Sequence, residues 1–418
     1  MVSEQLKAYL HGNSLLSCYQ SGFRKAHSTV TAATKVVNDI TGALDRKQHC
    51  ASLFIDFSKA FDTVDHDVLR LRLGSVGLSN AAVGWFSNYL SNRTQCVKSD
   101  GCTSNVLSVC KGVPQGSVLA PLLFTIYIND LGKDVCNANL HFYADDTVIY
   151  CCARSISQAV DYLQIAFKHI ETQFLQLRLV LNAGKTKMMI FSKSNSEIHP
   201  LPVVTTAQGD IIEIVPSFTY LGITLDKDLN FKPHIENLSK KLKVRLGFYF
   251  RNLACFPSHT RKRLVAATFL PVLDYGDVVY MHGCATSLGM LDATYHGALR
   301  FITGCKSLTH RDTLYDKVGW PSLSTRRLHH WYIFIYKALI GLLPPYLSSY
   351  LTITSNPRYN LRSEDFLNAS VPRARTEYGK SAFAYSAPKT WNQLQTTVKL
   401  TTLVSLRRFK LLISNLVT

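Results

Sequence analysis

The amino-acid sequence predicts an α+β fold in which a half containing short strands precedes a more helical and strongly basic half. Apolar runs rich in β-branched and aromatic residues end at Ile55 and occupy 140–144 and 147–150, as expected for strands. From Ile235 to Tyr249, apolar residues instead recur at helical spacing. The chain has 418 residues. That length is enough for about two or three domains, each with its own core.

Asp145 and Asp146 occupy the turn expected between 140–144 and 147–150. Tight hairpin turns usually carry Gly or Asn, and two adjacent carboxylates repel each other unless a cation relieves the repulsion. For an isolated Asp-Asp pair, a solvated acidic turn would be the better explanation. Together with the elements described next, the pair predicts a site for a hard divalent metal ion.

A further carboxylate, that of Asp56, directly follows the apolar run that ends at Ile55. A charged side chain at this position is unfavourable for packing in the core, but it is well placed to take part in a functional site at the end of the strand. Two strands that each bring a carboxylate to one sheet edge can hold two Mg²⁺ ions about 3.5–4 Å apart, which stabilises the attacking and leaving oxygens of a phosphoryl displacement. Asp62 and Asp65 come after the strand, so we expect a solvated or helix-capping role for both.

Between the acidic elements lies the loop Gly112-Val113-Pro114-Gln115-Gly116-Ser117, and the mostly apolar segment 118–128 follows it. Ser117 can cap a buried helix over this segment, and Pro121 is tolerated because it falls in the first turn. Glycines allow the backbone of such a loop to approach a ligand closely. A simple junction between loop and helix is the alternative interpretation.

In this order, the elements resemble the reverse transcriptases of non-LTR (LINE-type) retrotransposons. The resemblance begins at Gln20-Ser21-Gly22-Phe23-Arg24-Lys25, includes a primer-grip-like segment at 218–226 and is weaker beyond it. It implies a right-hand polymerase with fingers and a palm over 1–226, a helical thumb over 227–305 and a basic C-terminal region of unknown role over 306–418. It also implies an RNA-directed DNA polymerase, which adds deoxynucleotides to a primer 3′-OH.

The resemblance implies the catalytic chemistry of individual residues. Asp56, Asp145 and Asp146 match the carboxylates that bind two Mg²⁺ ions, for which Mn²⁺ is a possible substitute. Lys185 matches the lysine that protonates the pyrophosphate leaving group, with Lys187 as the second choice, and a solvated turn lysine is the alternative for either.

Other residues match the positions that contact the incoming nucleotide. Arg24 resembles the residue that grips the triphosphate, a task suited to its planar, permanently charged fork, and Lys25 resembles a helper. Phe61 stands at the position of the sugar gate, where a ring would clash with a ribose 2′-OH. Gln115 resembles a residue that lines the nucleotide, and Gly116 one that lets the template approach.

Basic residues are concentrated in the second half of the chain. Residues 1–226 contain 19 Lys and Arg against 18 Asp and Glu, whereas 227–418 contain 27 against 10. This asymmetry predicts an electrostatic grip on a phosphate backbone, and a merely solubilising surface is the alternative. The candidates lie on the expected helix over 235–249 and on a further helix starting near Ser258, and they are Lys240, Lys241, Lys243, Arg245, Arg261, Lys262 and Arg263.

The partners implied by the resemblance are an RNA template, a DNA primer and deoxynucleoside triphosphates, whereas protein partners stay unknown. The eleven cysteines include no CxxC pair, and the N-terminus lacks a signal-peptide pattern. We therefore expect reduced thiols in an intracellular, non-secreted protein of the nucleus or cytoplasm. No run approaches the roughly 18–20 apolar residues that span a membrane. The stretches 355–360 and 371–380 are expected to be exposed loops.

Two alternatives compete with this function. One is a polymerase that copies DNA rather than RNA, and the other is a catalytically inactive, nucleic-acid-binding remnant. Against the remnant, the residues that match the catalytic and nucleotide positions are intact, namely Asp56, Asp145, Asp146, Gln115 and Arg24. No endonuclease precedes the matching motifs and no Cys-His knuckle follows them, so the resemblance implies a fragment of a longer protein.

Overall fold

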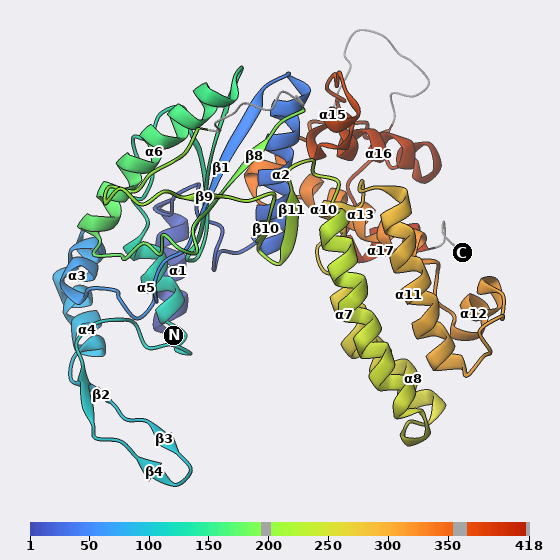
Figure 1. The fold of residues 1–418 in the computed structure, drawn as a ribbon, viewed down its shortest axis with the longest axis horizontal. Helices are drawn as coiled ribbons and strands as arrows, with labels where there is room; N and C mark the ends of the chain where they lie inside the picture. The colour runs from blue at the N-terminus through green and yellow to red at the C-terminus, as the bar shows by residue number, and fades with distance from the viewer. Residues whose placement is uncertain (194–201, 354–365, 415–418) are drawn as a thin grey trace. The chain divides into compact units, whose positions relative to one another are not determined.

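The computed structural model describes residues 1–193, 202–353 and 366–414, and the chain divides into two compact units (Figure 1). Unit 1 comprises Met1–Thr29 and Gln48–Val215, and unit 2 comprises Val30–Lys47 and Pro216–Thr418. The domain boundaries expected at 226 and 305 stay predictions. Both units contain helices and antiparallel strands, which confirms the α+β prediction.

Unit 1 is built on a five-stranded sheet of order β6-β7-β1-β8-β9. Its strands are β1 (His49–Ile55), β6 (Asn139–Tyr143), β7 (Asp146–Ala153), β8 (Lys187–Phe191) and β9 (Glu213–Ile214). The strand β1 lies in the centre and pairs antiparallel with β7 and β8; β6 pairs antiparallel with β7, and β9 runs parallel to β8. The strand predicted to end at Ile55 and the hairpin predicted over 140–150 are confirmed.

Unit 1 also contains helices, and local sequence signals explain where they begin. They are α1 (Val2–Gly12), α3 (His66–Ser75), α4 (Asn80–Leu90), α5 (Ala120–Tyr127) and α6 (Ile156–Gln176). Asp65 caps α3 by accepting hydrogen bonds from the backbone N–H groups of Asp67 and Val68, which confirms its expected capping role. Pro121 lies in the first turn of α5, as predicted.

A two-stranded arm connects α4 to the glycine-rich loop that precedes α5. It consists of the pair β2 (Arg93–Gln95) and β5 (Leu107–Val109) and, farther out, the pair β3 (Lys98–Ser99) and β4 (Cys102–Thr103). Figure 1 shows the arm extending away from the sheet of unit 1. Almost all of its residues are exposed. Its short strands therefore lack the alternation of apolar and polar residues that predicts a half-buried strand.

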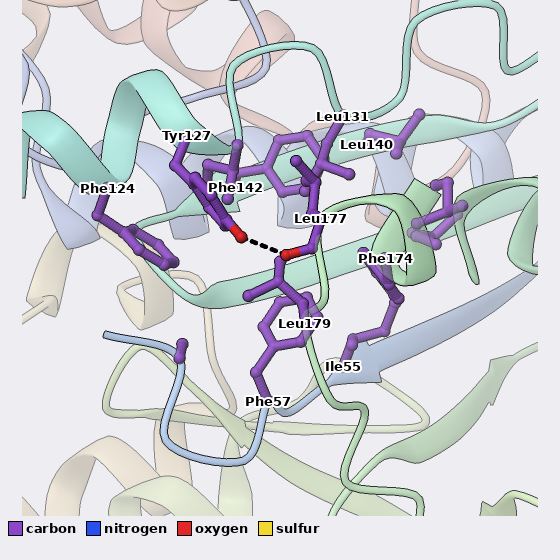
Figure 2. Packing of buried hydrophobic residues seen from close by; sticks show 14 of the residues in the cluster. Ile55, Phe57, Phe124, Tyr127, Leu131, Leu140, Phe142, Phe174, Leu177 and Leu179 are labelled. Atoms are coloured by element: carbon purple, nitrogen blue, oxygen red, sulfur yellow. Dashed lines mark hydrogen bonds between the residues drawn. The ribbon is translucent and has the colours of Figure 1, made fainter. Parts of the chain in front are cut away.

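The core of unit 1 lies directly behind the ends of the strands that carry the acidic residues. Figure 2 shows Ile55 and Phe57 packed with Phe174 and Leu177, the latter near the C-terminal end of α6. The hydroxyl of the buried Tyr127 donates a hydrogen bond to the backbone carbonyl of Leu177. This packing gives the acidic residues a rigid support.

Unit 2 is mainly helical, apart from a hairpin of β10 (Ser217–Tyr220) and β11 (Ile223–Asp226). Its helices are α2 (Thr29–Asp45), α7 (Lys232–Arg251), η1 (Leu253–Cys255), α8 (Ser258–Leu264), η2 (Val265–Phe269), α9 (Leu270–Leu273), α10 (Asp277–Tyr280), α11 (Ala285–Thr303), α12 (Arg311–Val318), α13 (Leu323–Leu339), α14 (Pro345–Ser348), α15 (Glu377–Ser381), α16 (Phe383–Val398) and α17 (Leu406–Ser414). The apolar stripe expected on α7 is buried, and α7 packs against α11. The helix expected from Ser258 is confirmed as α8.

The helix α2 belongs to unit 2 although it lies near the N-terminus of the chain. Asn38 Oδ1 accepts a hydrogen bond from the N–H of Ala384, 2.8 Å away. The Asp45 carboxylate accepts hydrogen bonds from the N–H groups of Arg375 and Thr376, at 3.0 and 2.7 Å. A Cβ on Gly379 would lie only 2.3 Å from this carboxylate, so glycine permits the contact.

The two expected loops have different outcomes. Residues 371–376 form a mostly exposed loop, whereas α15 begins at Glu377. The stretch 355–360 lies outside the described residues. In the described part of the chain, no helix has the length and apolar character needed to cross a membrane.

Candidate active site

The three predicted metal-binding carboxylates lie at one end of adjacent antiparallel strands. In the sheet, Ile55 of β1 stands opposite Thr147 of β7. Continuing this register by one residue places Asp56 beside Asp146, the first residue of β7. Asp145 precedes it in the turn that joins β6 to β7. Residues separated by about 90 positions in the sequence are therefore brought to the same sheet edge.

Burial and the neighbouring carboxylates raise the pKa values of Asp145 and Asp146. For Asp145, burial and the negative charge of Asp56 are the causes. For Asp146, burial and the charges of Asp145 and Asp56 raise the pKa to about 6. A bound cation would relieve the repulsion among these carboxylates.

Asp56 offers a further sign that a cation fits this edge. Its Oδ2 atom is buried and has no hydrogen-bond partner among the described residues. Leaving a buried carboxylate oxygen unpaired is costly, and coordination to a metal ion is one way to satisfy it. The ligand atoms of the three carboxylates do not, however, all lie within 4.8 Å of one another.

Among the described residues, the group that meets this distance criterion is Asp274, Asp277 and His330 in unit 2. It is already neutralised by protein side chains. Arg326 donates two hydrogen bonds to Asp274, at 2.8 and 2.5 Å, and His330 lies 2.5 Å from Asp277. The hydrogen bond to Asp277 raises the pKa of His330. We therefore interpret this cluster as an ion-pair network that fastens α13 to the α9–α10 segment.

Lys185 lies in a turn that is attached to the backbone of Asp56. The N–H of Asn182 donates to the carbonyl of Asp56 over 2.9 Å, which places the turn beside the acidic strand end. Lys185 is exposed, whereas Lys187 is held in β8 by an ion pair of 2.7 Å with Glu213. Lys185 is therefore the freer of the two side chains, and its role at the site stays a prediction.

The predicted sugar gate, Phe61, is held by other rings. Its ring stacks on that of Phe124 with a centroid distance of 4.3 Å and an interplanar angle of 23°. The ring of Phe23 meets it edge-on, 6.4 Å between centroids. Phe61 is half-buried, so one part of the ring is fixed by packing while the rest is accessible. Its gating role stays a prediction.

Arg24 is engaged with the backbone around it. Its Nη1 atom donates hydrogen bonds to the carbonyls of Ser17 and Gln20, at 2.6 and 2.9 Å. A triphosphate would have to compete with these contacts for the guanidinium. Lys25 is exposed at the next position.

Gln115 is fastened to Asp62, for which a solvated or helix-capping role is expected from the sequence. Its Nε2 atom donates a hydrogen bond to Asp62 Oδ1 over 2.7 Å. Gly112 allows this approach, because its φ is +86° and a Cβ there would lie 2.8 Å from the carbonyl oxygen of Asp62. Gly116 has a φ of +79°, a conformation that favours glycine, with open space around it. The only sequence signal for this contact with Gln115 is that Asp62 directly follows the expected gate, Phe61.

Gln115 also lines a basic cavity that no sequence motif predicted. Its volume is about 520 Å³, and its lining includes the side chains of Lys59, Arg93 and Lys111. Arg93 packs over the ring of Tyr89, with 4.6 Å to the centroid. Neither Lys59 nor Lys111 takes part in an ion pair among the described residues. Asp62 also lines the cavity, so three basic side chains face one acidic one, and a phosphate could neutralise the remaining positive charge.

The basic residues predicted to contact nucleic acid fall into two groups. The first group donates hydrogen bonds to backbone carbonyls and so connects helices of unit 2. Arg245 donates to the carbonyl of Thr268, Arg261 to that of Phe256 and Lys262 to that of Val318. The others are exposed, without an ion pair or side-chain hydrogen bond in the described part of the chain, and they are Lys240, Lys241, Lys243 and Arg263. The second group is the better source of phosphate contacts.

Comparison with known proteins places this geometry in a family. Residues 1–225 match the family described as "Reverse transcriptase (RNA-dependent DNA polymerase)". Over 340 residues the chain is 28% identical to "Probable RNA-directed DNA polymerase from transposon X-element" of Drosophila melanogaster, covering 76% of this chain and 36% of that protein. Over 296 residues it is 29% identical to "RNA-directed DNA polymerase from mobile element jockey" of Drosophila funebris, covering 68% of this chain and 32% of that protein. The chain thus spans about a third of the length of these curated relatives.

Two solved structures of telomerase are also similar. That of Candida albicans, in complex with a TWJ fragment of telomeric RNA, has a TM-score of 0.44 and 12% identity over 77% of this chain and 58% of that chain. Apo telomerase of Candida tropicalis has a TM-score of 0.39 and 12% identity over 99% of this chain and 60% of that chain. The family match covers more than half of the 418 residues. The chain therefore belongs to the reverse transcriptase (RNA-dependent DNA polymerase) family, and its motifs resemble those of the non-LTR retrotransposon members.

Proposed function

We propose that this chain catalyses RNA-directed DNA synthesis, adding deoxynucleotides to a primer 3′-OH, as in non-LTR retrotransposons. The observation that carries the proposal is the convergence of Asp56, Asp145 and Asp146 at one end of β1 and β7, where their charges repel one another. Family membership supports the reaction class, and the α+β fold agrees with a right-hand polymerase.

Two divalent ions, Mg²⁺ or Mn²⁺, would be held by these three carboxylates. When bound, they supply positive charge to the attacking and leaving oxygens of the displacement. The donor set suits such hard cations, because it consists of carboxylate oxygens, one of which is buried and unpaired. The carboxylates fix the place where the primer 3′-OH meets the nucleotide α-phosphate.

Other residues of unit 1 position the nucleotide. Arg24 binds the triphosphate, assisted by Lys25, because a guanidinium can donate two parallel hydrogen bonds to phosphate oxygens. Phe61 excludes a ribose 2′-OH with the accessible part of its ring. Gln115 lines the nucleotide, and Lys185 holds a proton for the pyrophosphate leaving group. The contacts that fasten Phe61, Gln115 and the turn of Lys185 support these roles.

Nucleic acid contacts both units in this proposal. The template approaches Gly116 and the adjoining basic cavity, whose lysines take part in no ion pair among the described residues. The primer–template duplex is gripped by unit 2, in which the hairpin of β10 and β11 serves as primer grip and α7 and α8 form the thumb. An intracellular site of action, in the nucleus or cytoplasm, agrees with eleven cysteines that are all free thiols.

Primer extension tests the proposal directly. The full chain is given the same DNA primer annealed to an RNA template or to a DNA template of identical sequence, with Mg²⁺, with Mn²⁺ or with a chelator. We expect metal-dependent extension on RNA. Extension on DNA alone would replace the proposal by the DNA-copying alternative, and template binding without extension under any condition would support the inactive remnant.

A further inference from the structure

The turn that carries the predicted metal ligands, Tyr143–Asp146, has an unusual backbone conformation. Ala144 has a φ of +56°. Residues with a side chain rarely adopt this left-handed conformation, because the Cβ crowds the neighbouring carbonyl. Contacts from elsewhere must therefore hold the turn, and they come from the segment that contains Gln20.

Gln20 closes the turn from the side. Its side chain is 1% exposed. The Oε1 atom accepts hydrogen bonds from the N–H of Gly22, at 2.6 Å, and from the N–H of Ala144, at 3.2 Å. One buried oxygen thus binds the backbone of both segments, and the second of these bonds is made to the residue directly before Asp145.

The backbone around Gln20 is fastened to β6 at the same place. The N–H of Ser21 donates to the carbonyl of Phe142 over 2.7 Å, and the N–H of Phe142 donates to the carbonyl of Tyr19 over 2.8 Å. Gly22 is required for this close approach, because a Cβ there would lie 2.3 Å from the N atom of Ala144. The segment therefore acts as an extra strand beside β6, with its tightest contact at the acidic turn.

Packing alone does not explain a glutamine at this position. Its Nε2 atom is buried without a hydrogen-bond partner among the described residues. An unpaired buried donor costs free energy, and a methionine of similar size would fill the space without that cost. The feature of glutamine that the structure uses is the acceptor oxygen aimed at the Ala144 amide.

We propose that Gln20 is a positioning residue for polymerisation, which acts by holding the backbone that carries Asp145 and Asp146. This inference rests on the proposed function. Gln20 does not touch the nucleotide in this account; it fixes the direction in which the two carboxylates leave the turn. Its backbone carbonyl, which accepts a hydrogen bond from Arg24, survives any side-chain substitution. The proposal therefore predicts an effect on turnover rather than on nucleotide binding.

The test compares Gln20→Met, which removes the acceptor, with wild type in the full chain. Gln164→Met is the matched control, because Gln164 Oε1 likewise accepts from a backbone amide, that of Thr205 at 2.7 Å. That amide belongs to the segment leading into β9, at the opposite edge of the sheet from β6. Two properties are measured: hydrogen exchange of the metal-free protein in the peptide over 140–147, and kcat and KM for one nucleotide on an RNA template.

In Gln20→Met we expect exchange at the turn about tenfold faster or more, because the Ala144 amide loses its acceptor. We expect kcat to fall by roughly 10–100-fold with KM for the nucleotide nearly unchanged, since a small misplacement of reacting groups has effects of this size. Gln164→Met should change neither property.

Wild-type exchange or wild-type kcat in a folded Gln20→Met variant would overturn the proposal. If that variant does not fold, Gly22→Ala is used instead, which pushes a Cβ against Ala144 while keeping Gln20. Normal exchange and kcat in folded Gly22→Ala, or unfolding of both variants while Gln164→Met folds, would also overturn it. If the wild-type chain extends no primer, the proposed function fails, whereas the exchange comparison still decides whether Gln20 holds the turn.

Discussion

Gln115 Nε2 donates a hydrogen bond to Asp62 Oδ1 over 2.7 Å, and this bond fastens the loop before α5 to the turn after β1. Backbone contacts accompany it, since the N–H of Val113 donates to the carbonyl of Phe61 over 2.9 Å. The predicted sugar gate and the predicted nucleotide-lining residue are therefore parts of one connected structure. Their relative placement is set before a nucleotide arrives.

Replacing Asp62 with alanine should weaken nucleotide binding. Without its acceptor, the Gln115 amide is free to rotate, and the loss of one hydrogen bond is worth about 0.5–1.5 kcal/mol, or roughly two- to tenfold in KM. Single-nucleotide extension on an RNA template measures this KM. Asp67→Ala, which removes another exposed carboxylate of the same region, is the control and should leave KM unchanged. An unaltered KM in Asp62→Ala would show that the bond does not orient Gln115.

Asp145→Asn should lower primer extension by several orders of magnitude and leave template binding nearly unchanged. The substitution keeps the size of the side chain and removes the negative charge that a divalent ion requires. Extension rates and filter-binding affinities are measured on the same preparation. Asp161→Asn, an exposed position on α6, serves as the control. Near-normal extension by Asp145→Asn would refute the two-metal assignment.

Phe61→Val should admit ribonucleotides. Shortening the side chain opens space for a 2′-OH, and differences of this size change discrimination by roughly 10–100-fold. The ratio of kcat/KM for deoxynucleotide over ribonucleotide is the quantity to measure. Phe23→Val, which removes the ring that meets Phe61 edge-on, controls for lost packing. Equal selectivity in Phe61→Val and wild type would make Phe61 a packing residue only.

The salt dependence of duplex binding should depend on the exposed cations of unit 2. Replacing Lys240, Lys241, Lys243 and Arg263 with Gln should make the slope of log affinity against log salt shallower by up to about 4. The control replaces Arg261 and Lys262, which donate to backbone carbonyls. In that control the main effect should be a lower melting temperature, with a smaller change in the salt slope than in the quadruple variant. An unchanged slope in the folded quadruple variant would place the grip elsewhere.

The cluster around His330 should make stability depend on pH. Asp277 holds the pKa of His330 above its usual 6.5, and Asp274 and Arg326 are the other charged groups that act on His330. Burial raises the pKa of Asp277, and the direct 2.5 Å contact with His330 opposes that shift. A raised folded-state pKa means that the folded chain binds the proton more tightly, so this contribution is complete below about pH 6.5 and is lost as the pH rises through the folded-state pKa.

The corresponding measurement is the free energy of unfolding of wild type and of His330→Gln, from about one pH unit below the ordinary histidine pKa of 6.5 upward through the titration. The difference between the two proteins should shrink as the pH rises. A chelator should have no effect on it, because Arg326 and His330 already neutralise the carboxylates. A chelator-sensitive difference would instead indicate a metal ion at Asp274 and Asp277.

Local patterns were sufficient to predict much of the fold. The strand before Asp56, the acidic hairpin, the helix after Ser117 and the buried stripe of α7 are all confirmed, because each depends on residues close together in sequence. The same holds for the capping role of Asp65. Periodicity and turn composition report on such short-range structure.

Long-range contacts could not be predicted in the same way. Nothing in the composition of α2 indicates that Asn38 and Asp45 bind segments more than 300 residues away. The exposed arm has strands of two or three residues, too short for a recognisable alternation. At the site, Asp62 and Gln20 act through single hydrogen bonds to distant partners, and such partners are fixed only once the chain is folded.

The contacts of α2 also bear on synthesis of the chain. The carboxylate of Asp45 and the amide of Asn38 find their partners in residues 375–384. At ribosomal rates of about 5–20 residues per second, those residues emerge roughly 17–70 seconds after α2. Unit 2 cannot be completed before then, although all of unit 1 has been translated once Val215 is reached. The face of α2 that is buried in the folded protein must therefore be kept from aggregating for most of the translation of the chain. Chaperones meet this requirement for other proteins in which an early segment can fold only after a late one has been made.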